Sequence, residues 1–307
     1  MPTETQPTLS ILIPAYNYPA GVLRIVLPLL AENRSDIEIL VHDDSTDDSL
    51  ETCMLELAKS HPALSYVRNT QALGAIGNWN NLLKRARGRY AVLIHHDDFP
   101  LSATFASDLL LDLEKSGWPD AIILSCLAYN VALKQIRACI CNPIRRFIAK
   151  HMPFYLFRRN VIGPPSVLVV RQDLFEGYDA KLRWLVDVEA YFHFLKSRTR
   201  RLFFSRLIMV SSTGLPGAIS TSIRDNVKEI TEAELVYIET KHPGMKRRTL
   251  NAFPRAAYAL SEKIVWAMIR TSSLLCGTIM RPPTYAEVLH REQFSLDHPQ
   301  ERTIDAA

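Results

Sequence analysis

The sequence predicts an α/β fold built on a mostly parallel sheet flanked by helices. Short apolar runs of strand length alternate with segments of helical apolar spacing over residues 1–130. Two of these runs, 37–41 and 90–94, lead directly into acidic residues. The chain has 307 residues, of which 48% are hydrophobic and 22% charged, so it can bury a large core without cross-links.

Apolar and β-branched runs indicate five strands in this first part of the chain. The first strand is expected to stop at Pro14, because proline has no N–H group to donate to a sheet. The second and fourth are nearly free of polar residues, as expected for strands that are covered on both faces. The expected strands are residues 9–13, 37–41, 65–68, 90–94 and 121–125.

Four helices are expected between and after these strands. Pro28 lies inside the first helix and predicts a kink or an early end. Asp47 or Asp48 is expected to cap the second helix, because a side-chain oxygen at that position accepts from the free N–H groups of the first turn. The expected helices are residues 20–32, 49–60, the later part of 74–87, and 102–116.

The alternation fades after residue 130. One strand is expected over 167–170, and helices over 184–195, 229–240 and 255–280. Loops are expected over 153–165, which leads into Gly163-Pro164-Pro165-Ser166, and over 214–224. We therefore expect one domain over 1–225, with halves 1–130 and 131–225, followed by a helical C-terminal extension over 226–307.

The net charge of +4 conceals a basic block. Residues 137–206 carry 14 Lys and Arg against 5 Asp and Glu, or +9, with aromatic residues between the arginines. Such a block suits phosphates, an anionic membrane face or nucleic acid, or it is a solvated surface. No signal peptide or membrane-spanning segment is expected. The five cysteines are expected to be reduced thiols.

Acidic residues follow two of the expected strands. The tetrad His95-His96-Asp97-Asp98 follows the strand 90–94, and the acidic segment 43–48 follows the strand 37–41. Adjacent carboxylates at a strand end repel each other and lose hydration, so they favour a cation or a hydroxylated ligand. Ligands of open α/β sheets bind at this edge. The alternative is that Asp97 and Asp98 cap the helix that begins near Ser102.

These motifs resemble the family-two glycosyltransferases, whose fold is GT-A, a Rossmann-like α/β fold. The resemblance covers about the first 130 residues and is carried by residues 10–17 (SILIPAYN), 41–48 (VHDDSTDD), 69–80 (with Asn69, Leu73-Gly74 and Gly77-Asn78-Trp79-Asn80), 86–90 (ARGRY) and 96–98 (HDD). Residues 163–166 (GPPS) and 184–189 (WLVDVE) are similar to the acceptor-side region of the family.

The resemblance implies a nucleotide-sugar donor and a divalent cation, Mg²⁺ or Mn²⁺. By this resemblance, Tyr16 lies against the nucleobase and Asp44 recognises the base by accepting its imide N–H. Asp97 lies near the ribose, and Asp98 binds the metal. His96 stands where the family has the first acid of an Asp-x-Asp pattern. His95 and His96 are either metal ligands or structural and acceptor-side groups. The expected donor-binding residues are Pro14, Ala15, Tyr16, Asn17, Asp44, Gly74, Asn78, His96 and Asp97.

Inverting transfer needs a general base close to the acceptor hydroxyl. Asp187 matches the family's base position at the start of a helix, where the helix dipole is expected to lower its pKa. Glu189 is the alternative, although two residues at this spacing point to different faces of a helix. A purely structural alternative is that Asp187 caps the helix.

The resemblance therefore implies a metal-dependent hexosyltransferase that acts with inversion. Its expected donor is a UDP- or dTDP-sugar, and its acceptor a hydroxyl of a glycan or lipid-linked molecule in bacterial cell-surface polysaccharide assembly. We expect a cytoplasmic protein, peripheral to the inner face of the membrane if the basic block contacts anionic lipid, and no nucleic-acid partner. The alternative is a catalytically silent nucleotide-sugar-binding or membrane-associated scaffold module. A nucleotidyltransferase would need a Gly-rich basic loop after the first strand, where this chain has Pro14-Ala15-Tyr16-Asn17.

Overall fold

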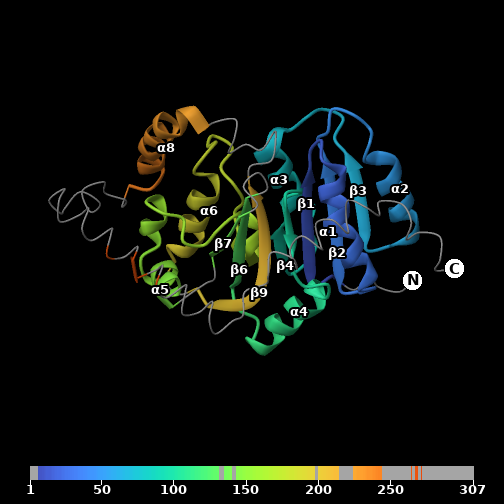
Figure 1. Ribbon diagram of the computed structural model, residues 1–307, viewed down its shortest axis with the longest axis horizontal. Coiled ribbons are helices and arrows are strands. Elements are labelled where there is room, and N and C mark those ends of the chain that lie inside the picture. The colour runs from blue at the N-terminus through green and yellow to red at the C-terminus, as the bar shows by residue number, and fades with distance from the viewer. Residues whose placement is uncertain are drawn as a thin grey trace.

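A computed structural model describes residues 6–130, 135–139, 143–197, 200–213 and 224–243, together with Ile264, Ala267, Met268 and Thr271. Within these residues, nine strands form one sheet with the order β3-β2-β1-β4-β8-β6-β9-β5, and β7 pairs with β6 at the side. Helices flank the sheet, so the architecture is the expected α/β fold (Figure 1). The strands are β1 Leu9–Ala15, β2 Ile37–Asp43, β3 Leu64–Arg68, β4 Tyr90–Leu93, β5 Asp98–Pro100, β6 Ala121–Asn130, β7 Gln135–Cys139, β8 Leu168–Arg171 and β9 Leu202–Thr213.

The helices that the sequence predicts in the first part of the chain are present, with small shifts of their ends. Within the described residues, α1 and α3 pack against β1, and α4 packs against β9. The α-helices are α1 Pro19–Ala31, α2 Glu51–Ser60, α3 Gly74–Arg85, α4 Phe105–Lys115, α5 Pro143–His151, α6 Val186–Leu195 and α8 Val227–Lys241. Short 3-10 helices span Pro153–Phe157, Pro165–Val167, Gln172–Leu174 and Arg224–Asn226.

The core of the first half is a parallel sheet in which β1 lies between β2 and β4. Every residue of β1 and β2 is buried, because both faces of the sheet are covered. Ser10 and Glu38 are polar residues that are buried within these strands, and the Ser10 hydroxyl donates to Glu38 Oε1 at 2.6 Å. Because the strands are parallel, the residues after β1, β2 and β4 meet at one edge of the sheet.

Three local expectations are corrected by the structure. The first strand continues through Pro14 to Ala15, because β4 pairs with β1 only as far as Leu12 and leaves the later residues paired on one side. Helix α1 runs past Pro28 to Ala31, so it does not end early, and the alternative of a kink at Pro28 stays a prediction. Neither Asp47 nor Asp48 caps α2. Asp47 Oδ1 instead accepts from the Ser49 N–H in a turn before the helix.

The second half of the chain shares the same sheet. Strand β8 runs antiparallel between β4 and β6, while β6 and β9 are parallel. The sequence predicts β8 and α6 but misses β5, β7 and β9. Helix α8 confirms the helix expected over 229–240 and lies next to α6 in Figure 1. The expected 214–224 loop lies almost entirely outside the described residues, as does most of the 255–280 helix. The boundary after residue 225 stays a prediction.

None of the described helices combines the length and apolar character that a membrane crossing requires. Cys53 is a free thiol, and the reduced state of the other cysteines stays a prediction.

Candidate functional site

The loops that follow β1 and β2 are tied together at the carboxyl edge of the sheet. The Asp44 N–H donates to the Ala15 carbonyl at 3.0 Å. Asn17 has a φ of 47°, a left-handed conformation that asparagine tolerates better than most residues. Its N–H donates to Ser45 Oγ at 2.8 Å, and its Oδ1 accepts from the Thr46 N–H at 2.9 Å. Asn17 thus joins two expected donor-binding loops.

Asp44 is buried and already hydrogen-bonded through both carboxylate oxygens. Asn69 Nδ2 donates to Oδ1 at 2.6 Å, and the Leu73 N–H donates to Oδ2 at 3.0 Å. Asn78 Nδ2 donates to the His42 carbonyl at 3.0 Å and lies next to Asn69. These contacts fix the carboxylate before any ligand arrives, and each oxygen retains a lone pair for a further donor.

Tyr16 is exposed to solvent at the end of β1. It follows β1 directly and is 48% exposed, unlike the buried strand before it. Gly74 begins α3 with a φ of 69°, and a side chain there would meet nothing within 4 Å, so the space above it is open. The expected base-side residues therefore border an accessible region rather than the core.

Asp98 is a buried carboxylate with few compensating groups. It is 1% exposed, and the Ser166 hydroxyl donates to its Oδ2 at 2.5 Å. Burial raises the pKa of Asp98 from 3.8 to about 8, and the neighbouring charge of Asp97 acts in the same direction, while hydrogen bonds from Ser166 and Ser211 oppose it. Asp98 begins β5, whereas α4 begins at Phe105 after Thr104, so the acid pair does not cap that helix.

His95 completes a possible set of metal ligands. Its ring packs on Trp79 with 4.5 Å between ring centroids, and its buried Nε2 has no hydrogen-bond partner within the part of the chain that the structure describes. Burial lowers the pKa of His95 to about 4, so the imidazole is neutral at pH 7. One ligand atom each of His95, Asp97 and Asp98 lies within 4.8 Å of the others. A neutral imidazole beside two carboxylates fits a divalent cation.

His96 faces another way. Its Nδ1 is 3.1 Å from the Pro14 carbonyl, which can only accept, so Nδ1 carries the proton. The His96 carbonyl approaches α1 so closely that a Cβ on Gly21 would lie 2.1 Å from it. The structure therefore places His96 as a link between the β1 exit and the acidic tetrad, beside the donor-binding residues that the sequence predicts.

Asp187 lies in the first turn of α6, as the sequence predicts. Asn160 Nδ2 donates to its Oδ2 at 2.7 Å, and the Val188 N–H donates to its Oδ1 at 2.8 Å. The expected direction of its pKa shift is wrong: burial raises the pKa of Asp187 from 3.8 to about 6, and these hydrogen bonds offset burial only in part. A carboxylate with this pKa is mostly ionised at pH 7 and can accept a proton.

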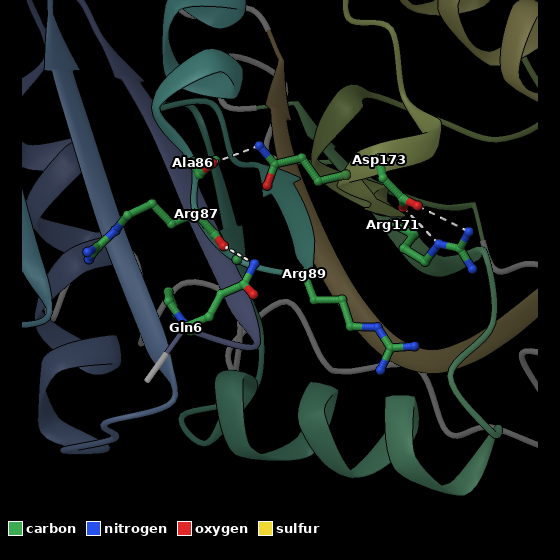
Figure 2. A pocket seen from close by; sticks show the side chains of 9 residues that line it. Gln6, Ala86, Arg87, Arg89, Arg171 and Asp173 are labelled. Atoms are coloured by element: carbon green, nitrogen blue, oxygen red, sulfur yellow. Dashed lines mark hydrogen bonds and ion pairs between the residues drawn. The ribbon is translucent and has the colours of Figure 1, made fainter. Parts of the chain in front are cut away.

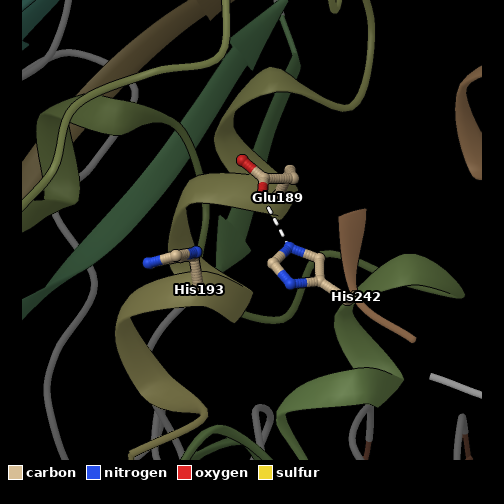
Figure 3. A group of neighbouring side chains, drawn as sticks. All are labelled: Glu189, His193 and His242. Atoms are coloured by element: carbon tan, nitrogen blue, oxygen red, sulfur yellow. Dashed lines mark hydrogen bonds and ion pairs between the residues drawn. The ribbon is translucent and has the colours of Figure 1, made fainter. Parts of the chain in front are cut away.

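Glu189 is buried and lies in a polar cluster with His193 and His242 (Figure 3). Its Oε1 is 2.8 Å from His242 Nε2 and 3.0 Å from Lys241 Nζ. Ligand atoms of Glu189, His193 and His242 lie within 4.8 Å of one another, an arrangement that metals use. Here the Lys241 ammonium already supplies the positive charge at Glu189, and a second cation beside it would be repelled.

A large cavity lies at the opposite edge of the sheet (Figure 2). Its volume is about 930 Å³, and it borders the starts of β1 and β4. Its arginines have partners: Arg87 pairs with Glu38, Arg171 with Asp120 and Asp173, and Arg89 lies over the Trp118 ring. The expected site residues do not line this cavity.

Three residues at the site escape prediction from the sequence. Asn160 holds Asp187, Ser211 donates to Asp98, and Glu234 binds the backbone ahead of α6. The only signal for Asn160 is its position three residues before Gly163, where an asparagine side chain commonly folds back on a turn. Ser211 and Glu234 reach the site by long-range packing, which leaves no local pattern.

Taken together, a mixed sheet with an acidic carboxyl edge defines the GT-A class of glycosyltransferase fold. The sequence profile "Glycosyl transferase family 2" matches residues 10–178, more than half of the chain, and the chain belongs to this family.

Similar curated proteins match this chain over part of its length. GalNAc(5)-diNAcBac-PP-undecaprenol beta-1,3-glucosyltransferase of Campylobacter jejuni is 28% identical over 102 residues, 33% of each chain. The Escherichia coli UDP-Glc:alpha-D-GlcNAc-diphosphoundecaprenol beta-1,3-glucosyltransferase WfaP is 29% identical over 107 residues, 34% of this chain and 42% of that protein. The match thus covers only 33% and 42% of the length of these two relatives.

Solved structures show the same fold at low sequence identity. TarS 1-349 of S. aureus in complex with UDP-GlcNAc aligns with a TM-score of 0.54 and 15% identity, over 70% of this chain and 61% of that one. The mannosyltransferase PcManGT from Pyrobaculum calidifontis, in complex with GDP-Man and Mn²⁺, aligns with a TM-score of 0.50 and 16% identity, over 97% and 89%.

Proposed function

We propose that this family-two protein transfers a hexose with inversion from a nucleotide-diphosphate sugar to an acceptor hydroxyl. One observation carries the proposal: the loop over 160–166 holds both key acids, Asp187 through Asn160 and Asp98 through Ser166. A carboxylate that can accept a proton and a carboxylate that can hold a cation are thus fixed relative to each other. Single-displacement transfer from a diphosphate donor needs both.

In the proposed reaction, the acceptor oxygen forms a bond to the anomeric carbon while the bond from that carbon to the diphosphate oxygen breaks. The electron pair of the breaking bond leaves with the nucleoside diphosphate. Asp187 takes the proton of the acceptor hydroxyl. Its pKa of about 6 suits this role, because the group is ionised at pH 7 and still basic enough to accept. Glu189 is the weaker candidate, because its carboxylate is buried and bound to Lys241 and His242.

Asp98, with Asp97 and His95, would hold the divalent cation. When bound, Mg²⁺ or Mn²⁺ would offset negative charge on the diphosphate. A bound cation would give the unpartnered nitrogen of His95 a partner and would offset the burial that raises the pKa of Asp98. A nitrogen ligand favours Mn²⁺ over Mg²⁺, because Mg²⁺ prefers an all-oxygen shell.

The donor is proposed to be a UDP- or dTDP-sugar. Asp44 would accept the imide N–H of uracil or thymine, and Tyr16 would lie against the base, with Pro14, Ala15, Asn17, Gly74 and Asn78 around them. Several relatives are named as transferring glucose to undecaprenol-linked sugars, two of them from UDP-Glc, which supports a lipid-linked or glycan acceptor in bacterial surface polysaccharide assembly.

An anionic membrane face is the proposed location of the acceptor. Helix α5 presents Phe147, 57% exposed, among the exposed basic residues Arg146 and Lys150. A basic helix with an exposed aromatic ring suits the interface of an anionic bilayer. We therefore propose a cytoplasmic protein peripheral to the membrane, in which the domain over 1–225 has a donor half and an acceptor half and 226–307 forms a helical extension.

Calorimetry and turnover with UDP-glucose, dTDP-rhamnose and GDP-mannose test the proposal. We expect Mn²⁺-dependent binding of at least one uridine or thymidine donor, and donor turnover that Asp187→Asn abolishes without weakening binding. Donor binding without turnover in the presence of a range of lipid-linked and glycan acceptors would favour the silent scaffold module. Absence of binding by all three nucleotide sugars would overturn the proposal.

A further inference from the structure

The segment that carries Asp187 is held from outside the region that matches the family profile. Helix α8 and the segment with Asp187 both lie beyond residue 178, where that match ends, and Lys241 of α8 contacts Glu189 of α6. Glu234 of α8 is buried and points its carboxylate at the backbone just before α6. Its Oε1 accepts from the Arg183 N–H at 2.5 Å, its Oε2 accepts from the Leu185 N–H at 2.8 Å, and both oxygens are 3.2 Å from the Trp184 nitrogen.

Backbone N–H groups ahead of a helix have no partner within the helix itself. They also lie at the positive end of the helix dipole, so a carboxylate is favoured there. Among the described residues, Glu234 has no ion-pair partner, and the backbone N–H groups of residues 183–185 are its hydrogen-bond donors. A long-range side chain therefore does what a local capping residue usually does for α6.

Further contacts of α8 hold the chain on either side of residues 183–185. Upstream, the Tyr237 hydroxyl and Lys241 Nζ donate to Asp179 Oδ2 at 2.9 and 2.8 Å. Downstream, Lys241 also reaches Glu189 Oε1 at 3.0 Å. The contacting residues lie three or four positions apart on α8, which places them on one face of the helix. Residues 179–189 are thus attached to α8 at three points, and Asp187 lies between the last two.

Resting on the proposed function, we propose that Glu234 is a positioning residue, which sets Asp187 against the acceptor by holding the 183–185 backbone. Among the described residues, the Asp187 carboxylate accepts hydrogen bonds from Asn160 and from the Val188 N–H in the first turn of α6. If the Glu234 contact is lost, the backbone that leads into this turn loses its attachment to α8, and we expect the Asp187 carboxylate to be displaced. Catalysis is sensitive to such movement, because a displacement of about 1 Å can cost roughly 100-fold in rate.

The test compares Glu234→Gln with Glu232→Gln, the same chemical change at an exposed position of the same helix. The amide keeps the shape of the side chain but turns one acceptor into a donor that faces backbone N–H groups. With UDP-glucose as donor probe and Mn²⁺, we expect kcat to fall about 10- to 100-fold in Glu234→Gln, while the donor KM and the affinity for UDP stay at wild-type values. We expect no change in Glu232→Gln. An unchanged kcat in Glu234→Gln would overturn the proposal.

Asp187→Asn, assayed in parallel, separates the two proposals. If Asp187→Asn keeps full turnover, the proposed base is wrong, whatever Glu234→Gln does. If Asp187→Asn stops turnover and Glu234→Gln keeps wild-type kcat, the result supports Asp187 as the base and refutes Glu234 as a positioning residue.

Amide hydrogen exchange of the wild-type protein gives a readout that does not depend on activity or on the folding of a variant. We expect slow exchange at the amides of residues 183–185, although they precede α6, and faster exchange there in Glu234→Gln but not in Glu232→Gln. Exchange of these wild-type amides at the rate of an open loop would refute a fixed 183–185 backbone.

Discussion

Asn160 Nδ2 donates to Oδ2 of Asp187 at 2.7 Å, while Asn160 Oδ1 accepts from the N–H groups of Ile162 and Gly163. One asparagine therefore orients the proposed base and shapes the turn that leads to Ser166. The same short loop thus contacts both the proposed base, through Asn160, and the proposed metal ligand Asp98, through Ser166.

The first prediction concerns pH. A general base acts only when ionised, so with a pKa of about 6 for Asp187, kcat should fall about tenfold for each pH unit below 6 and level off above it. The measurement is a pH–rate profile at saturating donor and metal. Asn160→Ala removes a hydrogen bond that favours the ionised form, so its acid limb should move to higher pH. A profile that is flat down to pH 5 would contradict the assignment of Asp187.

The second prediction concerns metal binding at Asp98. Asp98→Asn should abolish the effect of Mn²⁺ on UDP affinity, because the proposed site loses its buried carboxylate. In the wild type, Mn²⁺ with UDP should raise the melting temperature through binding to the folded state, and in the variant it should not. Calorimetry and thermal melts with and without chelator measure both effects. Equal Mn²⁺ dependence of UDP affinity in the two proteins would show that the metal does not bind at Asp98.

The third prediction is that Asp98 lowers stability in the metal-free protein. Its pKa is raised from 3.8 to about 8 in the folded state, so the unfolded chain ionises first and stability is lost as pH rises from about 4 to 8. Asp98→Asn should therefore melt a few degrees higher than wild type at pH 7.5 in chelator, on the order of 1 kcal/mol or more. At pH 4 the two proteins should melt at similar temperatures. A lower melting temperature of the variant at pH 7.5 would contradict this account.

The fourth prediction concerns base recognition by Asp44. Asp44→Asn loses one acceptor and places an amide donor toward Asn69 or Leu73, both of which donate to the carboxylate. UDP affinity should fall by about tenfold or more, because a hydrogen bond to a charged group contributes roughly 1.5–3 kcal/mol. Titration with UDP and GDP measures the change, and Asp225→Asn, at an exposed position, is the control. Equal UDP affinity in Asp44→Asn would remove Asp44 from the donor site.

The fifth prediction concerns Gly21. A Cβ at this position would lie 2.1 Å from the His96 carbonyl, so Gly21→Ala must push α1 away from the acidic tetrad. We expect a loss of stability of about 1–3 kcal/mol, although Gly to Ala inside a helix is normally favourable. Denaturant unfolding measures it. A more stable Gly21→Ala protein would show that α1 and the tetrad are not in contact.

Much of the donor side could be predicted because its signals are local. A parallel strand covered on both faces reads as an apolar run, and the acids after β2 and β4 follow such runs directly. Parallel pairing then brings Asp44 and Asp98 to one edge without further information. The continuation of β1 through Pro14 was not predictable in this way, since it depends on where the pairing with β4 ends.

The acceptor side was harder to predict because its contacts are long-range. The helix that carries Asp187 is visible in the sequence, but the partners of Asp187 and of the segment before it are 27 and about 50 residues away. Strand β9 pairs with β6 across some 80 residues, so no hairpin signal announces it. The direction of the Asp187 pKa shift was missed for the same reason, because burial is a property of tertiary packing rather than of helix position.

Strand β8 comes from the second half of the chain but lies between β4 and β6 in the sheet. The proposed donor half and acceptor half therefore share one sheet and do not form separate modules. A chimera that joins residues 1–130 to the remainder of a relative would have to re-form the pairing of β8 with both β4 and β6. Changes of acceptor preference should be sought by grafting loops onto an intact sheet, not by exchanging halves of the chain.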